Sequence, residues 1–303
     1  MTLKSKGATA VAAVVLSLGA AHLAMAHTPY LLPNAFDAER DHVTLEGSLT
    51  EDAYFSPDIA LKTTSYVETL PDGQTQSLAP SAMLKDLALV EAPLSASGTY
   101  RFSTGQFIAR SNKMALIDGK WVMVRPAGGP ERHGPDHASG ADAGKGGENH
   151  GEHPHGDGPH GVSEADVPPG AKTMLVQGVL TAETYVSKGA PTQAALATSG
   201  KGLELKPVTH PDAVYVDEGF AFKFLLDGAP ATGVPITVYR SGDVYDDKRI
   251  AAEVKTDASG AAKVGFDRPG VYLLTAHYPA AGADGDAPAA HTYVYSLTFE
   301  VTR

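Results

Sequence analysis

The stretch Phe220-Ala221-Phe222-Lys223-Phe224-Leu225-Leu226, followed by the pair Asp227-Gly228, decides the fold class. Its phenylalanines recur at every second position, which is the period of side chains on one face of a β-strand. Asp-Gly is a typical tight-turn pair. The stretch therefore predicts a strand that ends at a tight turn.

Similar segments follow it along the C-terminal part of the chain. Each is short, and turn sequences such as Asp257-Ala258-Ser259-Gly260 and Pro269-Gly270 separate them. Strands and turns at this spacing predict an immunoglobulin-like or prealbumin-like β-sandwich over residues 201–303. The further strands expected there are Val234–Tyr239, Ala251–Thr256, Ala262–Phe266, Val271–Tyr278 and Tyr293–Val301.

The N-terminal part has the same character. Met114–Ile117 and Lys120–Val124 flank Asp118-Gly119, which predicts a hairpin with a type I′ turn. We expect a second β-sandwich over residues 27–125 and a connecting strand region over 170–200. The fold class is thus all-β, with two immunoglobulin-like or prealbumin-like sandwich domains. The remaining N-terminal strands are expected at His42–Leu49, Thr64–Leu70, Leu84–Val90 and Ser97–Phe102.

Residues 126–169 differ from both predicted domains. Six of the chain's twelve histidines lie here, among glycine, proline and acidic residues that cannot form a core. We expect a disordered His/Gly-rich insertion that binds late first-row metal ions with little selectivity, which suits buffering or delivery. The alternative is a hydrophilic spacer. The histidines are His133, His137, His150, His153, His155 and His160.

Residues 1–26 read as a secretory signal peptide. Lys4 and Lys6 precede the apolar run Ala8–Ala21, and Ala24-Met25-Ala26 fits the A-x-A cleavage rule. Cleavage would place the mature chain in the periplasm, beginning at His27, with no later membrane span. An uncleaved anchor is the alternative.

The composition of the mature chain excludes several function classes. It carries 22 basic and 35 acidic residues, a formal charge of −13, which disfavours nucleic acid and anionic membranes as partners. It has no cysteine, so a metal site would use imidazole, carboxylate or backbone nitrogen. No motif of a hydrolase elbow, phosphate loop, dinucleotide site or zinc protease occurs. We therefore expect a protein that is not an enzyme.

His27 is the sharpest candidate ligand. After cleavage it would carry a free α-amine, whose nitrogen closes a six-membered chelate with Nδ1 on Cu(II) or Ni(II). A site based on a histidine in third position is excluded, because Pro29 stands there and has no amide hydrogen. Further ligands must come from the fold, and the candidates are His210, His277 and His291, each of which can also be a structural histidine. For His27, the alternative is a histidine that merely follows the cleavage site.

Several segments resemble a known family. They are residues 26–33, 184–192, 200–211, 256–260 and 269–272. The chain resembles the periplasmic domain-of-unknown-function family that includes NikM-like nickel transport complex proteins, over nearly all of the mature chain except the insertion. The resemblance implies an exported two-domain β-protein with a terminal histidine, here His27, and with His210 in the motif Pro-Val-Thr-His-Pro. It also implies an outer-membrane receptor or an inner-membrane metal transporter as partner. The branch with a third-position histidine and transmembrane helices is not matched, since Pro29 occupies that position.

Three functions compete. The first is a periplasmic protein for uptake, delivery or buffering of a transition metal ion, with Ni(II) or Co(II) favoured and Cu(II) or Zn(II) also compatible. The second is a copper-binding histidine-brace carrier or oxygenase. The third is a scaffold or adhesion module without a specific metal site.

Overall fold

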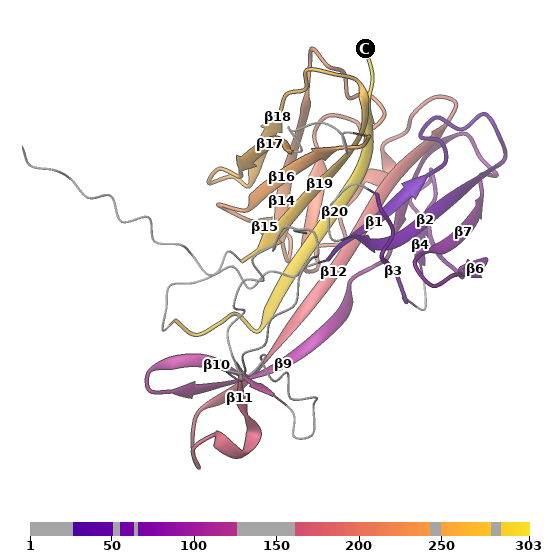
Figure 1. Ribbon diagram of the computed structural model, residues 1–303. Coiled ribbons are helices and arrows are strands. Elements are labelled where there is room, and N and C mark those ends of the chain that lie inside the picture. Colours follow the sequence, from indigo (N-terminus) through magenta and orange to yellow (C-terminus); the bar gives the residue numbers. More distant parts are fainter. Residues whose placement is uncertain (1–26, 51–54, 64–65, 126–160, 243–249, 280–285) are drawn as a thin grey trace, which may run out of the picture.

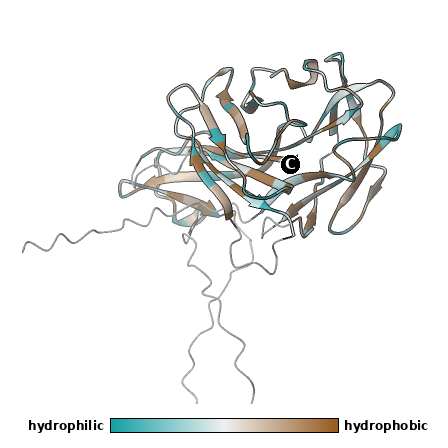
Figure 2. Cartoon of the chain, turned by 90° about the horizontal axis from the view of Figure 1, so that it is seen from above, coloured by the Kyte–Doolittle hydropathy of each residue, from teal (hydrophilic) through white to brown (hydrophobic). Residues whose placement is uncertain are grey.

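The computed structural model describes residues 27–50, 55–63, 66–125, 161–242, 250–279 and 286–303. Within these ranges the chain is all-β, as the sequence predicts, and its strands form sheets of eleven, five and four strands (Figure 1). Hydrophobic and hydrophilic residues alternate along many of the strands (Figure 2). The helical elements are two single 3-10 turns, η1 (Glu164–Asp166) and η2 (Ala194–Leu196).

The fold is organised around β12 (Thr173–Lys188), which lies in the middle of the eleven-stranded sheet. On one edge it pairs in parallel with β20 (His291–Val301). On the other edge it pairs with β9 (Phe107–Ile117) along its first half and with β8 (Gly98–Ser103) at its end. The sheet continues through β19 (Gly270–Tyr278), β16 (Pro235–Arg240) and β17 (Ile250–Lys255) on one side, and through β4 (Tyr66–Thr69) and β5 (Thr75–Leu78) on the other.

The two faces of this sheet carry two different hydrophobic cores. Ala182 and Val186 of β12 belong to one core and Tyr185 to the other, because side chains alternate along a strand. A five-stranded sheet covers the first core: β1 (Thr28–Pro33), β2 (His42–Thr50), β3 (Ile59–Ala60), β6 (Ala82–Met83) and β7 (Ala88–Pro93). A four-stranded sheet covers the second: β13 (Leu203–Pro207), β14 (Phe220–Leu226), β15 (Ala229–Pro230) and β18 (Ala261–Val264).

Two sandwiches are therefore present, but they share one middle sheet. The region 170–200, expected from the sequence to connect two domains, supplies the strand common to both. The strand expected at Leu84–Val90 is interrupted, because the amide of Leu84 donates to the carbonyl of Leu87 in a turn between β6 and β7.

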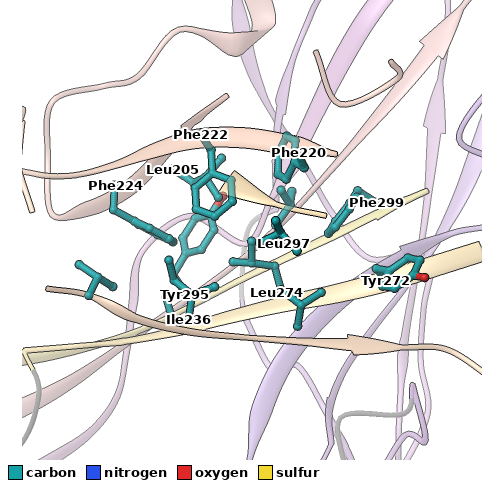
Figure 3. Packing of buried hydrophobic residues seen from close by; sticks show 14 of the residues in the cluster. Leu205, Phe220, Phe222, Phe224, Ile236, Tyr272, Leu274, Tyr295, Leu297 and Phe299 are labelled. Atoms are coloured by element: carbon teal, nitrogen blue, oxygen red, sulfur yellow. The ribbon is translucent and has the colours of Figure 1, made fainter. Parts of the chain in front are cut away.

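The phenylalanines of β14 confirm the fold-determining pattern. Phe220, Phe222 and Phe224 are at most 1% exposed and point into the core between β14 and β20 (Figure 3). The ring of Phe220 lies 5.1 Å from that of Phe299, and the ring of Phe224 meets Tyr295 edge-on at 5.3 Å. Such pairs add to the stabilisation that apolar burial gives.

The predicted hairpin is also confirmed. β9 and β10 (Lys120–Arg125) pair around Asp118 and Gly119, whose φ angles are 51° and 77°, as a type I′ turn requires. The hairpin extends away from the body of the molecule, and β11 (Val162–Ser163) pairs in parallel with β10 (Figure 1). Of the predicted disordered insertion 126–169, residues 126–160 are outside the described ranges. Residues 161–169 include β11 and the turn η1, so for this part the prediction of disorder is wrong, because pairing with β10 orders the chain there.

Candidate metal site

The position of His27 follows from how β1 lies on the middle sheet. The Ser296 hydroxyl of β20 donates to the Pro29 carbonyl, and the Ser187 amide of β12 donates to the Phe36 carbonyl at 2.9 Å. Ser187 lies further along β12 than the residue that pairs with Ser296. The chain therefore runs from Pro29 to Phe36 in the direction of β12 and β20. His27, which precedes Pro29, lies towards the start of β20.

A carboxylate holds the His27 ring. Its Nε2 lies 2.9 Å from Oδ2 of Asp58, and the two side chains are 29% and 49% exposed. Because an ionised carboxylate only accepts hydrogen bonds, Nε2 carries the hydrogen and donates it. In the neutral ring the lone pair is then on Nδ1, the nitrogen that a chelate with the α-amine uses.

His277 lies on the face of the middle sheet that β1 covers. It is on β19 opposite Val294 of β20, and two residues from Thr275, which pairs with Ser296. Because side chains alternate along a strand, His277 lies on the same face of β19 as Leu273, and Tyr30 of β1 packs against Leu273. The side chain of His277 is exposed. The strand register thus places His277 on the face of the middle sheet that β1 covers. Measured along the sheet, His277 and His27 lie on the same side of Ser296.

His291 lies elsewhere. It opens β20, where its Nε2 donates to Oε1 of Gln177 at 3.2 Å. It is in phase with Tyr293 and Tyr295, whose side chains face the core below the four-stranded sheet. His291 and His277 therefore belong to opposite faces of the middle sheet.

His210 is engaged at both ring nitrogens. Nδ1 accepts the amide hydrogen of Asp212 at 3.1 Å, and Nε2 donates to the Thr192 carbonyl at 3.0 Å, with the Thr99 hydroxyl at 3.3 Å. The side chain is only 10% exposed. Thr99 pairs with Ser187, so this histidine lies about 16 Å along β12 from the level of Ser296. His210 links three chain segments. Both of its ring nitrogens are used in these hydrogen bonds, so in this arrangement neither is available to bind a metal ion.

The four candidate histidines are thus not gathered in one place. Among the residues that the structure describes, no group of three or more His, Cys, Asp or Glu side chains is arranged to hold a metal ion. The six histidines of the insertion lie outside those residues. In the same part of the chain no helix is long and apolar enough to cross a membrane. Only His27 and His277 share a face and an end of the sheet.

The buried carboxyl of Asp212 lies beside His210, and no sequence pattern predicted it. Oδ2 of Asp212 is buried without a hydrogen-bond partner among the described residues. It lies 3.9 Å from Nδ1 of His210, but this is no ion pair, because Nδ1 accepts the Asp212 amide hydrogen and the ring is neutral. Burial raises the pKa of Asp212 to about 7, and the negative charge of Asp37 adds to the rise.

This raised pKa predicts a stability that falls as the pH rises. The folded protein keeps the proton of Asp212, which the unfolded chain releases near pH 4. The contribution of this proton to the free energy of unfolding is therefore fully present below about pH 4 and is lost as the pH rises towards 7. Asp212→Asn removes this loss. We expect the variant to exceed the wild type at about pH 8 by up to roughly 4 kcal/mol, and to match it at about pH 4. Urea unfolding across this range measures the difference; two parallel stability curves would contradict it.

Comparison with known proteins gives a family but no activity. The family described as Domain of unknown function (DUF4198) matches residues 24–280. No curated protein matches the chain. A solved structure, the Bacillus anthracis TIE protein, matches at 12% identity over 91% of this chain and 39% of its own, with a TM-score of 0.15. The chain thus spans well under half of that protein's length.

Proposed function

We propose that this chain, which belongs to the family of domains of unknown function DUF4198, is an exported protein that binds a late first-row transition metal. It would serve uptake, delivery or buffering of the ion in the periplasm, without enzymatic activity. The observation that carries the proposal is the hydrogen bond from Nε2 of His27 to Asp58. It fixes the ring of the residue that signal cleavage after Ala26 would turn into the N-terminus.

The chemistry of this terminus suits Ni(II), Co(II) and Cu(II). The α-amine and Nδ1 of His27 are two nitrogen donors in one chelate ring, and His277 on the same face is the candidate for a third. The amine exists only after cleavage, so the site would be completed by processing. The resemblance to NikM-like nickel transport proteins supports nickel or cobalt, with an outer-membrane receptor or an inner-membrane transporter as the partner.

A copper carrier is the second candidate. One observation favours it: His27 and His277 lie on the same face of the middle sheet, whereas His210 and His291 lie elsewhere. A terminal chelate with one further imidazole is the histidine-brace arrangement, and Cu(II) accepts such planar nitrogen donors. Relative affinities for Cu(II), Ni(II) and Co(II) separate the two candidates.

Metal titration tests the proposal. Mature protein, with His27 confirmed as its N-terminus by mass spectrometry, is titrated by calorimetry with each ion. We expect one site tighter than micromolar. A second protein, in which the six histidines of residues 126–160 are replaced by asparagine, should keep that site and lose only weaker additional binding, since flexible imidazoles capture ions with little geometric selectivity.

Two outcomes would contradict the proposal. A mature terminus other than His27, together with no ion bound tighter than micromolar, would leave the scaffold or adhesion alternative. Loss of the tight site in the asparagine variant would place the selective site in the insertion instead.

A further inference from the structure

We propose that Met114, Met123 and Met174 form a separate metal site, which binds one Cu(I) ion through their three thioether sulfurs. This site needs neither signal cleavage nor the chelate at His27, so it goes beyond the proposed function. The ligands expected from the sequence are imidazole, carboxylate and backbone nitrogen, and thioether sulfur adds a fourth kind.

The three methionines stand side by side where the β9–β10 hairpin leaves the body of the molecule (Figure 1). Met114 of β9 pairs with Met174 of β12 on one edge and with Met123 of β10 on the other. Residues opposite each other in antiparallel strands point to the same face, so the three side chains form one row. Of the six methionines in the chain, two lie in residues 1–26, and three of the other four are in this row.

The spacing of the strands allows the three sulfurs to meet at one ion. Adjacent strands lie about 4.8 Å apart, so the backbones of Met123 and Met174 are about 10 Å apart, with Met114 between them. A methionine side chain has three rotatable bonds, which lets the outer two lean over the central one. Met114 is 8% exposed, whereas Met123 and Met174 are partly exposed. The centre of the row is therefore sheltered, and an ion can enter from its ends.

The surroundings of the row favour Cu(I) over a divalent ion. Thioether sulfur is a soft, uncharged ligand, and such ligands select Cu(I). The pair Leu116 and Trp121 flanks the row on one side and Val176 on the other. β9 and β10 contain no acidic residue, while Arg125 follows Met123 on the same face and the Lys172 ammonium lies 5.9 Å from the centre of the Trp121 ring. A single positive charge costs least to desolvate and is repelled least here.

Nuclear magnetic resonance of the methionine methyl groups tests the site. Mature protein is labelled with methyl-¹³C methionine, and the six histidines of residues 126–160 are replaced by asparagine, because imidazole also binds copper. Cu(I) is added without oxygen, and it is diamagnetic, so signals shift rather than vanish. We expect the signals of Met114, Met123 and Met174 to shift together and to saturate at one equivalent. The signal of Met83, which lies on β6 and is 46% exposed, should not move.

Matched substitutions show whether the sulfurs are ligands. Met114→Leu keeps the volume and apolar character of the side chain, and such exchanges are well tolerated in cores. It should abolish the joint shift and lower the affinity for Cu(I), measured against a chelating dye, by at least about 10-fold. Met83→Leu should change neither readout. Met174→Leu, at a partly exposed position, decides the question if the thermal midpoint shows that Met114→Leu is not folded.

The outcomes separate this site from the one at His27. Signals that do not shift, or a Met83 signal that shifts with the others, would overturn the Cu(I) site and leave the row as a packing feature. Unchanged affinity for Cu(I) in a folded leucine variant would do the same. The calorimetric titration with Ni(II), Co(II) and Cu(II) tests the proposed function independently, and its failure would leave the methionine site standing.

Discussion

Phe299→Ala is expected to lower the free energy of unfolding by about 3–5 kcal/mol, a large part of the stability of an ordinary domain. Phe299 is 1% exposed and lies in the core beside Phe220 and Tyr272 (Figure 3). Its ring centre is 5.1 to 6.0 Å from those of Phe220, Phe266 and Tyr272. Truncation removes the buried ring and leaves a cavity that these neighbours can fill only in part. Urea unfolding followed by tryptophan fluorescence and circular dichroism measures the loss.

The effect should reach the whole molecule. β20 carries Phe299 into the C-terminal core and also carries Ser296, which anchors β1 of the five-stranded sheet. Both probes should therefore show one shared transition. Val208→Ala is the control, because Val208 is 66% exposed and should change stability by less than about 0.5 kcal/mol. Two separate transitions, with only the C-terminal one shifted, would show that the sandwiches unfold independently.

The fold class could be predicted from the sequence because the patterns that specify it are local. Alternation in Phe220–Leu226 and the Asp118-Gly119 turn each depend on neighbouring residues, and both are confirmed. The shared middle sheet could not be predicted. β12 alternates like any strand, and nothing in its pattern indicates that it borders β20 on one edge and both β8 and β9 on the other. Which edges pair is decided by contacts distant in sequence.

The sequence could suggest single residues for the candidate site but not how they are arranged. His27 could be singled out from the cleavage rule alone. Its partner Asp58 could not, since a lone aspartate before a two-residue strand has no pattern. The motif around His210 drew attention to a residue whose ring nitrogens bond Asp212 and Thr192 instead. Short motifs identify residue types, whereas hydrogen-bond partners depend on the folded chain.

His27→Ala is expected to weaken metal binding by at least about 100-fold, while His210→Ala should leave it unchanged. The first substitution keeps the α-amine but removes Nδ1, so the chelate ring cannot close. The second removes an imidazole that bonds the Asp212 amide and the Thr192 carbonyl. It should lower the free energy of unfolding by about 1–3 kcal/mol, because buried polar groups lose their partners. Calorimetry with Ni(II) and Cu(II), and urea unfolding of both variants, measure the two quantities.

The substitutions of His27 and His210 should change metal affinity and stability in opposite ways. If His27 is a ligand at the surface, its removal costs affinity and little stability, since its side chain is 29% exposed. If His210 is a structural link at the end of β12, its removal costs stability and no affinity. His277→Ala should resemble His27→Ala in kind, with a loss of about 10-fold, because it removes one donor and leaves the chelate. The reverse result, with affinity lost in His210→Ala and kept in His27→Ala, would move the metal site to the far end of the sheet.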